Sequence, residues 1–123
     1  MIDLTKWQGY PQVKKEWGRE IILINSPLYC TKYLVISPGK QCSLHKHNIK
    51  DETFYILEGE VLISHGERML ASEVKHVGDC FRVPCGLYHR FGSLGGAILL
   101  EVSSHHDEQD VERLIPSGDM LPF

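Results

Sequence analysis

Residues 39–59 read Gly-Lys-Gln-Cys-Ser-Leu-His-Lys-His-Asn-Ile-Lys-Asp-Glu-Thr-Phe-Tyr-Ile-Leu-Glu-Gly. His45 and His47 lie two positions apart, and Glu52 follows five positions after His47. Alternate side chains of a β-strand point to the same face, so the two histidines are predicted to project together. Residues 48–51 are polar and predict a turn, after which Glu52 begins a returning strand beside the histidines. This stretch therefore predicts two imidazoles and a carboxylate at one place in a β-protein.

A second block completes the set of ligands. Residues 78–89 read Gly-Asp-Cys-Phe-Arg-Val-Pro-Cys-Gly-Leu-Tyr-His. Pro84 ends one strand, Gly86 permits a tight turn, and His89 begins the next strand. Three imidazoles and one carboxylate suit a divalent transition metal and leave coordination positions open for water or substrate. We therefore expect one metal ion held by His45, His47, Glu52 and His89, without a basis for choosing among Zn, Mn, Fe, Ni and Co.

The rest of the chain is organised as short strands separated by Gly, Pro, Asn and Asp, which is typical of an antiparallel barrel or sandwich. Strands are expected at residues 20–25, 28–37, 41–47, 52–57, 61–65, 68–71, 80–83, 88–91 and 97–103. We therefore predict an all-β protein, a small antiparallel β-barrel. Its parts would be an N-terminal extension (1–19), the barrel (20–103) and a tail (104–123) with one helical turn near 109–114.

Composition limits the partners. The 123 residues carry a formal net charge of −3 and no Lys/Arg cluster, which argues against a nucleic-acid partner. No apolar run resembles a signal peptide or a membrane span, so a cytoplasmic location without membrane contact is expected. Trp7, Tyr10 and Trp17 precede the first predicted barrel strand and would need an apolar surface to cover them. They suggest a homodimer.

Both blocks resemble the two motifs of the cupin superfamily, and this resemblance covers about residues 17–103. It implies the jelly-roll type of barrel and the metal ligands already named. The second motif of that family usually ends in Asn, where this chain has Ser93. That Asn is not a metal ligand in the family, so the departure leaves the predicted site intact.

Flanking segments resemble, more loosely, the cupin of type II mannose-6-phosphate isomerases and the small cupins grouped with D-lyxose isomerase. These segments are Trp17-Gly18 and residues 34–39, 84–90, 100–103 and 108–113. The resemblance implies aldose–ketose isomerisation of a sugar or sugar phosphate. Glu101, which interrupts an apolar strand, is the candidate catalytic base, and Glu52 is the alternative base. Arg82 and Arg90 are candidate phosphate contacts.

Two other functions fit the same residues. A metal-dependent dioxygenase could use the same four ligands, since they suit several metals. A non-catalytic cupin that binds a sugar or metabolite would keep the barrel but would not need Glu101 as a base.

Overall fold

The computed structural model describes residues 2–120, and nearly all of their regular structure is β-strand, which confirms the predicted all-β class. The elements are η1 (Leu4–Trp7), β1 (Gln12–Lys15), β2 (Gly18–Asn25), β3 (Cys30–Ile36), β4 (Lys40–Gln41), β5 (Leu44–Lys46), β6 (Glu52–Gly59), β7 (Val61–Gly66), β8 (Ala71–Lys75), β9 (Cys80–Val83), β10 (Tyr88–Ser93), β11 (Ala97–Ser103), β12 (Glu112–Ile115) and β13 (Gly118–Asp119).

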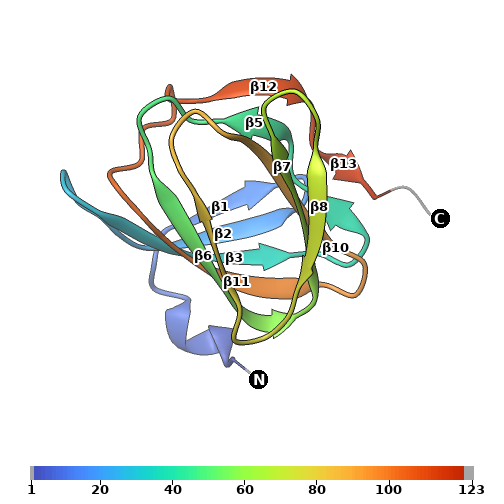
Figure 1. Cartoon of the computed structure of the whole chain (residues 1–123). Coiled ribbons are helices and arrows are strands. Elements are labelled where there is room, and N and C mark those ends of the chain that lie inside the picture. The colour runs from blue at the N-terminus through green and yellow to red at the C-terminus, as the bar shows by residue number, and fades with distance from the viewer. Residues whose placement is uncertain (1, 121–123) are drawn as a thin grey trace.

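Two antiparallel sheets enclose the core (Figure 1). The first has six strands in the order β1-β2-β3-β11-β6-β9. The second has seven strands and contains the path β12-β5-β10-β4-β13, while β7 pairs with both β10 and β8. The ligand segments thus lie on both sheets, with β5 and β10 in one and β6 in the other.

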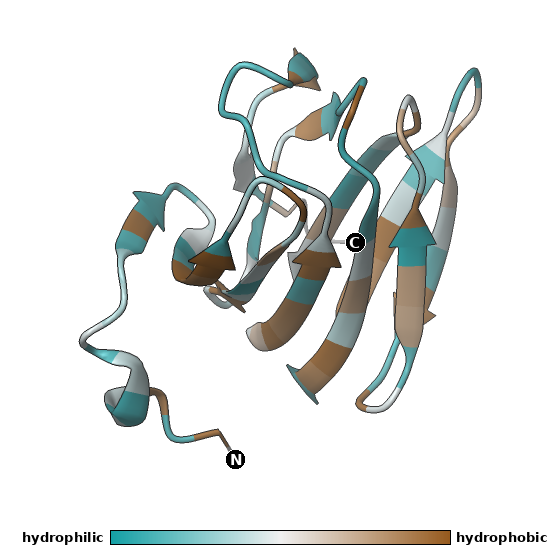
Figure 2. Cartoon of the chain, turned by 90° about the vertical axis from the view of Figure 1, so that its left-hand side faces the viewer, coloured by the Kyte–Doolittle hydropathy of each residue, from teal (hydrophilic) through white to brown (hydrophobic). Residues whose placement is uncertain are grey.

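The interior changes character along the barrel. On the first sheet, Leu34, Leu99 and Ile56 form one cross-strand row and are almost completely buried. Farther along the same strands, Lys32 and Glu101 face each other in register, and Ser103 faces Glu52. Brown apolar bands run along the strands in Figure 2, while the upper loops are mostly teal. The apolar end supplies the hydrophobic stabilisation and supports a charged end where the site lies.

Glycines of the two motifs occupy backbone conformations that other residues rarely adopt. Gly59 ends β6 with φ 78°, and a Cβ there would lie 2.3 Å from the carbonyl oxygen of Gly96. Gly86 has φ 82° in the turn before β10, and its N–H donates to the His47 carbonyl oxygen at 2.6 Å. The second glycine therefore ties the turn before His89 to the segment that carries His47.

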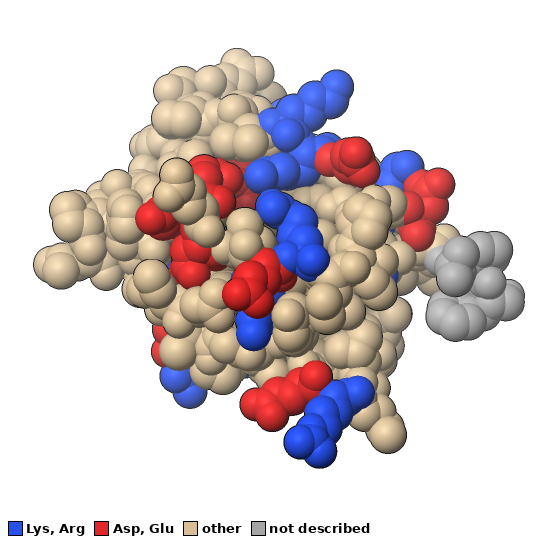
Figure 3. Space-filling view, turned by 90° about the horizontal axis from the view of Figure 1, so that it is seen from above, with Lys and Arg blue, Asp and Glu red and all other residues tan. Residues whose placement is uncertain are grey.

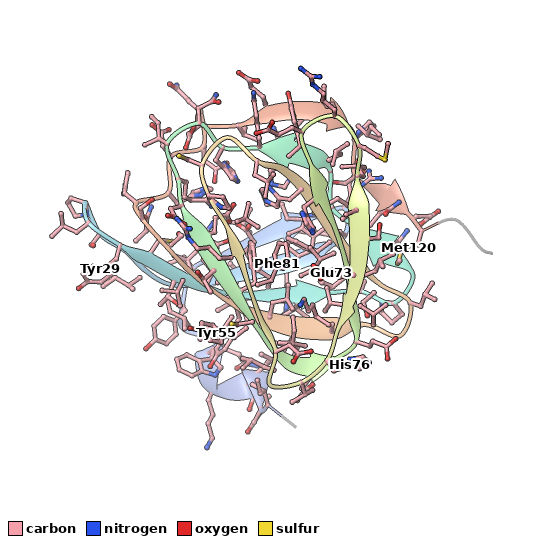
Figure 4. All side chains as sticks on the ribbon, in the orientation of Figure 1. Tyr29, Tyr55, Glu73, His76, Phe81 and Met120 are labelled. Carbon is pink, nitrogen blue, oxygen red and sulfur yellow. The ribbon has the colours of Figure 1, made fainter. Side chains whose placement is uncertain are left out.

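The N-terminal aromatic residues pack on their own barrel. Trp17 is buried in the core against Phe91, and their ring centroids are 5.4 Å apart. Trp7 on η1 packs against Tyr10 and against Tyr33 of β3, each at 5.2 Å. These contacts cover much of the aromatic surface that suggested a homodimer. The homodimer itself stays a prediction. Apolar side chains remain exposed elsewhere, including Tyr29, which projects at the tip of the β2–β3 hairpin (Figure 4).

Segments outside the predicted barrel take part in the sheets. Residues 12–15 add β1 to the edge of the first sheet. The helical turn predicted near residues 109–114 is wrong, because Glu112–Ile115 form β12 and pair with β5. The strand predicted at residues 68–71 begins instead at Ala71. Throughout residues 2–120, the structure contains no helix long and apolar enough to cross a membrane.

Candidate metal centre

Three histidines from neighbouring strands converge inside the charged end of the barrel. His45 lies on β5, His47 directly follows that strand, and His89 lies on β10, in register with His45. One ring nitrogen from each lies within 4.8 Å of the others. The strand alternation expected from the sequence thus produces the cluster, and antiparallel pairing brings the third imidazole to it.

Each imidazole is held by a backbone carbonyl through Nδ1. His45 Nδ1 lies 2.7 Å from the Ser43 carbonyl oxygen, His89 Nδ1 lies 3.0 Å from that of Leu87, and His47 Nδ1 lies 2.5 Å from that of Asp110. A carbonyl oxygen can only accept, so these contacts place the proton of each neutral ring on Nδ1. The lone pair is then on Nε2, which is the arrangement of metal-binding histidines.

Glu52 supplies the fourth group. Its Oε1 lies 3.3 Å from Nε2 of His47 and 3.3 Å from Nε2 of His89. Within residues 2–120, Glu52 Oε1 and His89 Nε2 are nevertheless buried without a hydrogen-bond partner, since an imidazole with its proton on Nδ1 has none to donate from Nε2. Buried polar atoms of this kind are rare and costly unless something else satisfies them. A divalent cation between these atoms would satisfy both, so the residues fit the predicted metal.

Burial also keeps His45 and His47 neutral, as ligands must be. Burial, with a smaller effect from neighbouring His89, lowers the pKa of His45 from 6.5 to about 3. Burial likewise lowers the pKa of His47, against the opposing charge of Glu52. At neutral pH His45 and His47 would therefore bind a metal with little interference from protons.

Beyond the ligands, two carboxylates share one buried ammonium group. Lys50 Nζ lies 3.4 Å from Glu52 Oε2 and 3.3 Å from Glu101 Oε2. Ser103 Oγ also donates to Glu101 Oε2, at 3.2 Å. Lys50 and Glu101 are each only 3% exposed. Lys50 lies in the polar stretch 48–51 that predicted a turn, yet its side chain is buried.

The pKa values of the two carboxylates shift in opposite directions, although Lys50 lowers both. For Glu52, burial raises the pKa, but the neighbouring His89 and the Lys50 charge outweigh burial and hold the pKa below its usual range. For Glu101, burial dominates and, together with repulsion from Glu52, raises the pKa despite the charge of Lys50. Carboxylates whose environments separate their pKa values in this way often divide the roles of charged ligand and proton carrier.

The ligands and Glu101 line a single cavity of about 320 Å³. Trp17 and Phe91 form part of its apolar wall, while Glu20, Ser43 and Lys50 add polar groups. Lys and Arg side chains lie among Asp and Glu side chains on the face seen from above (Figure 3). A cavity with a few convergent polar groups and shifted pKa values is where a small-molecule site is expected.

The predicted arginine contacts lie elsewhere. Arg82 forms two hydrogen bonds with Asp51, at 3.2 and 2.6 Å, and its side chain is 64% exposed. Arg90 donates to the carbonyl oxygens of Cys42 and Pro116. Neither lines the cavity, because each alternates along its strand with an inward residue, Val83 or His89. The alternation of side chains along a strand was the sequence signal that Arg82 and Arg90 point away from the cavity.

His106, in the segment between β11 and β12, also lines the cavity. Its Nδ1 lies 3.0 Å from Lys50 Nζ, and its Nε2 lies 2.8 Å from Glu108 Oε1. Burial and the charge of Lys50 lower the pKa of His106. A neutral ring that accepts from Lys50 and donates to Glu108 fits both contacts. No sequence pattern pointed to this residue, because a loop brings it to the site.

These shifts predict acid sensitivity of the metal-free protein. In the unfolded chain His45 would titrate near 6.5, but in the fold it stays neutral to about pH 3. Below pH 6.5 the unfolded state therefore binds a proton that the native state does not, and stability falls by up to about 1.4 kcal/mol per pH unit for each such group. Urea midpoints measured with a chelator should decline from pH 7 to pH 4.5. A midpoint independent of pH over this range would contradict the burial of neutral imidazoles. As a control, His76→Gln removes an exposed histidine and should leave the decline unchanged.

Comparisons with known proteins agree with this fold. Residues 32–103 match the family described as Cupin domain (Cupin_2). Two proteins named mannose-1-phosphate guanylyltransferase are each 25% identical to this chain. The match covers 85% of the chain for the Sinorhizobium fredii protein and 89% for the Escherichia coli protein. It spans only 21% and 24% of those proteins, so the chain corresponds to a minor part of each.

Solved structures show the same fold at low identity. Oxalate decarboxylase from Bacillus subtilis superposes with a TM-score of 0.77 at 18% identity, covering 88% of this chain and 31% of that one. CapF, solved with an inhibitor, gives a TM-score of 0.76 at 17% identity, covering 86% of this chain and 34% of that one. The sequence match extends over more than half of the 123 residues, and these folds agree with it. The chain belongs to the Cupin_2 family of cupin-domain proteins.

Proposed function

We propose that this cupin is a metal-dependent isomerase that interconverts the aldose and ketose forms of a sugar or sugar phosphate. One observation carries the proposal: Glu101, a buried carboxylate with a raised pKa, lines the same cavity as the four candidate metal ligands. Isomerisation needs a Lewis acid and a carboxylate that can take up and return a proton.

The four ligands would hold a divalent metal, which supplies a Lewis acid for the carbonyl and hydroxyl oxygens of the sugar. Glu101 takes the proton from C2 of the aldose and returns it to C1, while a hydroxyl proton moves from O2 to O1, so nothing is gained or lost. Within residues 2–120, both hydrogen bonds to its carboxylate end on Oε2 and come from Lys50 and Ser103. They fix the carboxylate and leave Oε1 for the transferred proton.

Glu52 is less suited to the proton transfer. Its pKa is held low, and its Oε1 faces the imidazoles of His47 and His89. Such a carboxylate remains ionised and directed at the metal position. The two acidic residues thus separate into a ligand and a base, with Lys50 orienting both.

Candidate contacts for a phosphate lie at the cavity mouth. Arg113 on β12 and Lys15 on β1 line the cavity, and neither has an ion pair within residues 2–120. Lys15 lies close enough to Glu108 to help lower that carboxylate's pKa. Arg113 presents a planar guanidinium suited to a phosphate. We propose Arg113, in place of Arg82 and Arg90, as the phosphate contact.

The relatives support a sugar-phosphate ligand. Both of the curated proteins are named for mannose 1-phosphate, and this chain aligns with a part of each. The cavity adds Trp17, whose ring would pack on the apolar face of a sugar.

The test begins with the metal content of purified protein, compared with His47→Ala. Loss of one of four ligands should strip most of the metal.

The reconstituted protein is then incubated without oxygen with a panel of aldoses, each with and without phosphate. Ketose formation and exchange of the C2 proton with heavy water are followed. Arg113→Gln should raise KM for phosphorylated sugars only. Isomerisation supports the proposal, whereas oxygen consumption with ferrous iron would favour the dioxygenase, and tight sugar binding without turnover would favour the binding module.

A further inference from the structure

Asp110, in the tail between β11 and β12, makes an unusual concentration of contacts with the segment that carries the metal ligands. Its carboxylate accepts hydrogen bonds from three successive backbone N–H groups, those of Asn48 at 2.8 Å, Ile49 at 3.2 Å and Lys50 at 3.0 Å. Its carbonyl oxygen lies 2.5 Å from Nδ1 of His47. One residue of the tail thus contacts four consecutive residues, 47–50.

The contacted segment has two tasks in the site. It connects the ligand His47 to the ligand Glu52, and it places the Lys50 ammonium beside Glu52 and Glu101. Successive N–H groups in a turn form a concave site for an anion, and here a carboxylate of the same chain occupies it. Among the described residues, positions 48–50 contribute Lys50 alone to the buried ion pairs, while the backbone N–H groups of all three positions donate to Asp110.

The carbonyl contact acts on the ring of His47. A histidine that ligates through Nε2 is oriented by the acceptor on its Nδ1–H, and the identity of that acceptor decides which nitrogen is free. For His45 and His89 the acceptor lies two residues away in the same strand or turn. For His47 it lies 63 residues away, so the tail must be docked before this ring is fixed.

We propose that Asp110 is a positioning residue of the metal centre, which locks the His47 ring by its carbonyl and the 48–50 turn by its carboxylate. This inference rests on the proposed metal site. It also assigns a role to the tail: the same segment that lines the cavity mouth with Val111 and Arg113 completes the orientation of a ligand.

Glu112 offers a matched control. It lies two residues further along the same tail, accepts from the Asn48 side chain at 3.2 Å, and pairs with Lys46 at 3.4 Å. It therefore docks the tail on β5 but touches neither His47 nor the backbone of the 48–50 turn. A variant at Glu112 removes tail contacts without removing the proposed clamp.

The experiment compares Asp110→Ala, Asp110→Asn and Glu112→Ala with the unaltered protein. Affinity for Co²⁺ is measured by chelator competition, with the visible spectrum as a report on coordination. Asp110→Ala keeps the backbone carbonyl but removes the carboxylate that docks it against the 48–50 turn, so the carbonyl should lose its fixed position beside His47. Loss of an outer partner of a ligand typically costs 10–100-fold in affinity, and we expect a loss of that order for Asp110→Ala. We expect a smaller loss for Asp110→Asn, which keeps one acceptor oxygen, and an affinity within about twofold of the unaltered protein for Glu112→Ala.

A second measurement needs no metal. In ¹⁵N-labelled metal-free protein, the His47 ring should carry its proton on Nδ1, and Asp110→Ala should shift it toward a mixture of tautomers while His45 and His89 stay unchanged. If the unaltered protein binds no Co²⁺, the metal site is wrong, and the ring tautomer still decides the clamp. The clamp is overturned if Asp110→Ala keeps both affinity and the His47 tautomer, or if Glu112→Ala loses as much affinity. Should Asp110→Ala fail to fold, Asp110→Asn decides by the same two measurements.

Discussion

Replacing Glu101 by Gln is expected to lower the isomerisation rate by roughly 10²–10⁴, the usual contribution of general acid–base catalysis. Gln keeps the size of the side chain and can still accept from Lys50 and Ser103, which hold Glu101 in the fold. It cannot take up the C2 proton. Exchange of that proton with heavy water should therefore fall together with turnover, while metal content stays unchanged.

Glu20 provides the control for Glu101→Gln. It is another carboxylate that lines the cavity, and it pairs with a buried lysine, Lys32, at 3.3 Å. Glu20→Gln changes the cavity charge by the same amount without touching the proposed base, so its rate should stay within about tenfold of the unaltered enzyme. Equal losses in both variants would indicate a general charge effect, and normal turnover of Glu101→Gln on a confirmed sugar would exclude Glu101 as the base.

The strands and the ligand cluster could be predicted because both depend on local pattern. Each predicted strand between residues 20 and 65 overlaps an observed one, since turn residues bound the apolar runs. His45, His47 and Glu52 lie within eight residues, so alternation along a strand and one turn suffice to bring them together. To place His89 beside these residues, it was enough to expect that its strand pairs antiparallel with the strand of His45.

The remaining parts of the site depend on contacts between distant segments. Lys50 lies in a polar stretch that predicts a turn, and only its pairing with Glu101, 51 residues away, explains its burial. The tail reads as polar and irregular, yet it brings His106, Asp110 and Arg113 to the cavity. Arg82 and Arg90 were predicted from charge beside the motif, whereas strand alternation directs them outward.

The buried lysine gives the second large expected effect, on stability. Lys50→Met should lower the free energy of unfolding of the metal-free protein by about 3–5 kcal/mol, because removing one partner of a buried ion pair leaves uncompensated charge. Here the ammonium group contacts both Glu52 and Glu101, and all three side chains are at most 4% exposed. Urea unfolding in the presence of a chelator measures the loss.

A second substitution shows where that energy resides. Adding Glu101→Gln to Lys50→Met removes one of the two stranded carboxylates, so the double variant should recover part of the stability lost in Lys50→Met. Metal should recover a further part, since a divalent cation held by the three imidazoles would offset the charge of Glu52. Lys46→Met is the matched control: Lys46 pairs with the half-exposed Glu112, and such surface pairs contribute about 0–1 kcal/mol. If Lys50→Met were no more destabilising than Lys46→Met, neither carboxylate would depend on Lys50 for its burial, and the proposed role of Lys50 in orienting both would be wrong.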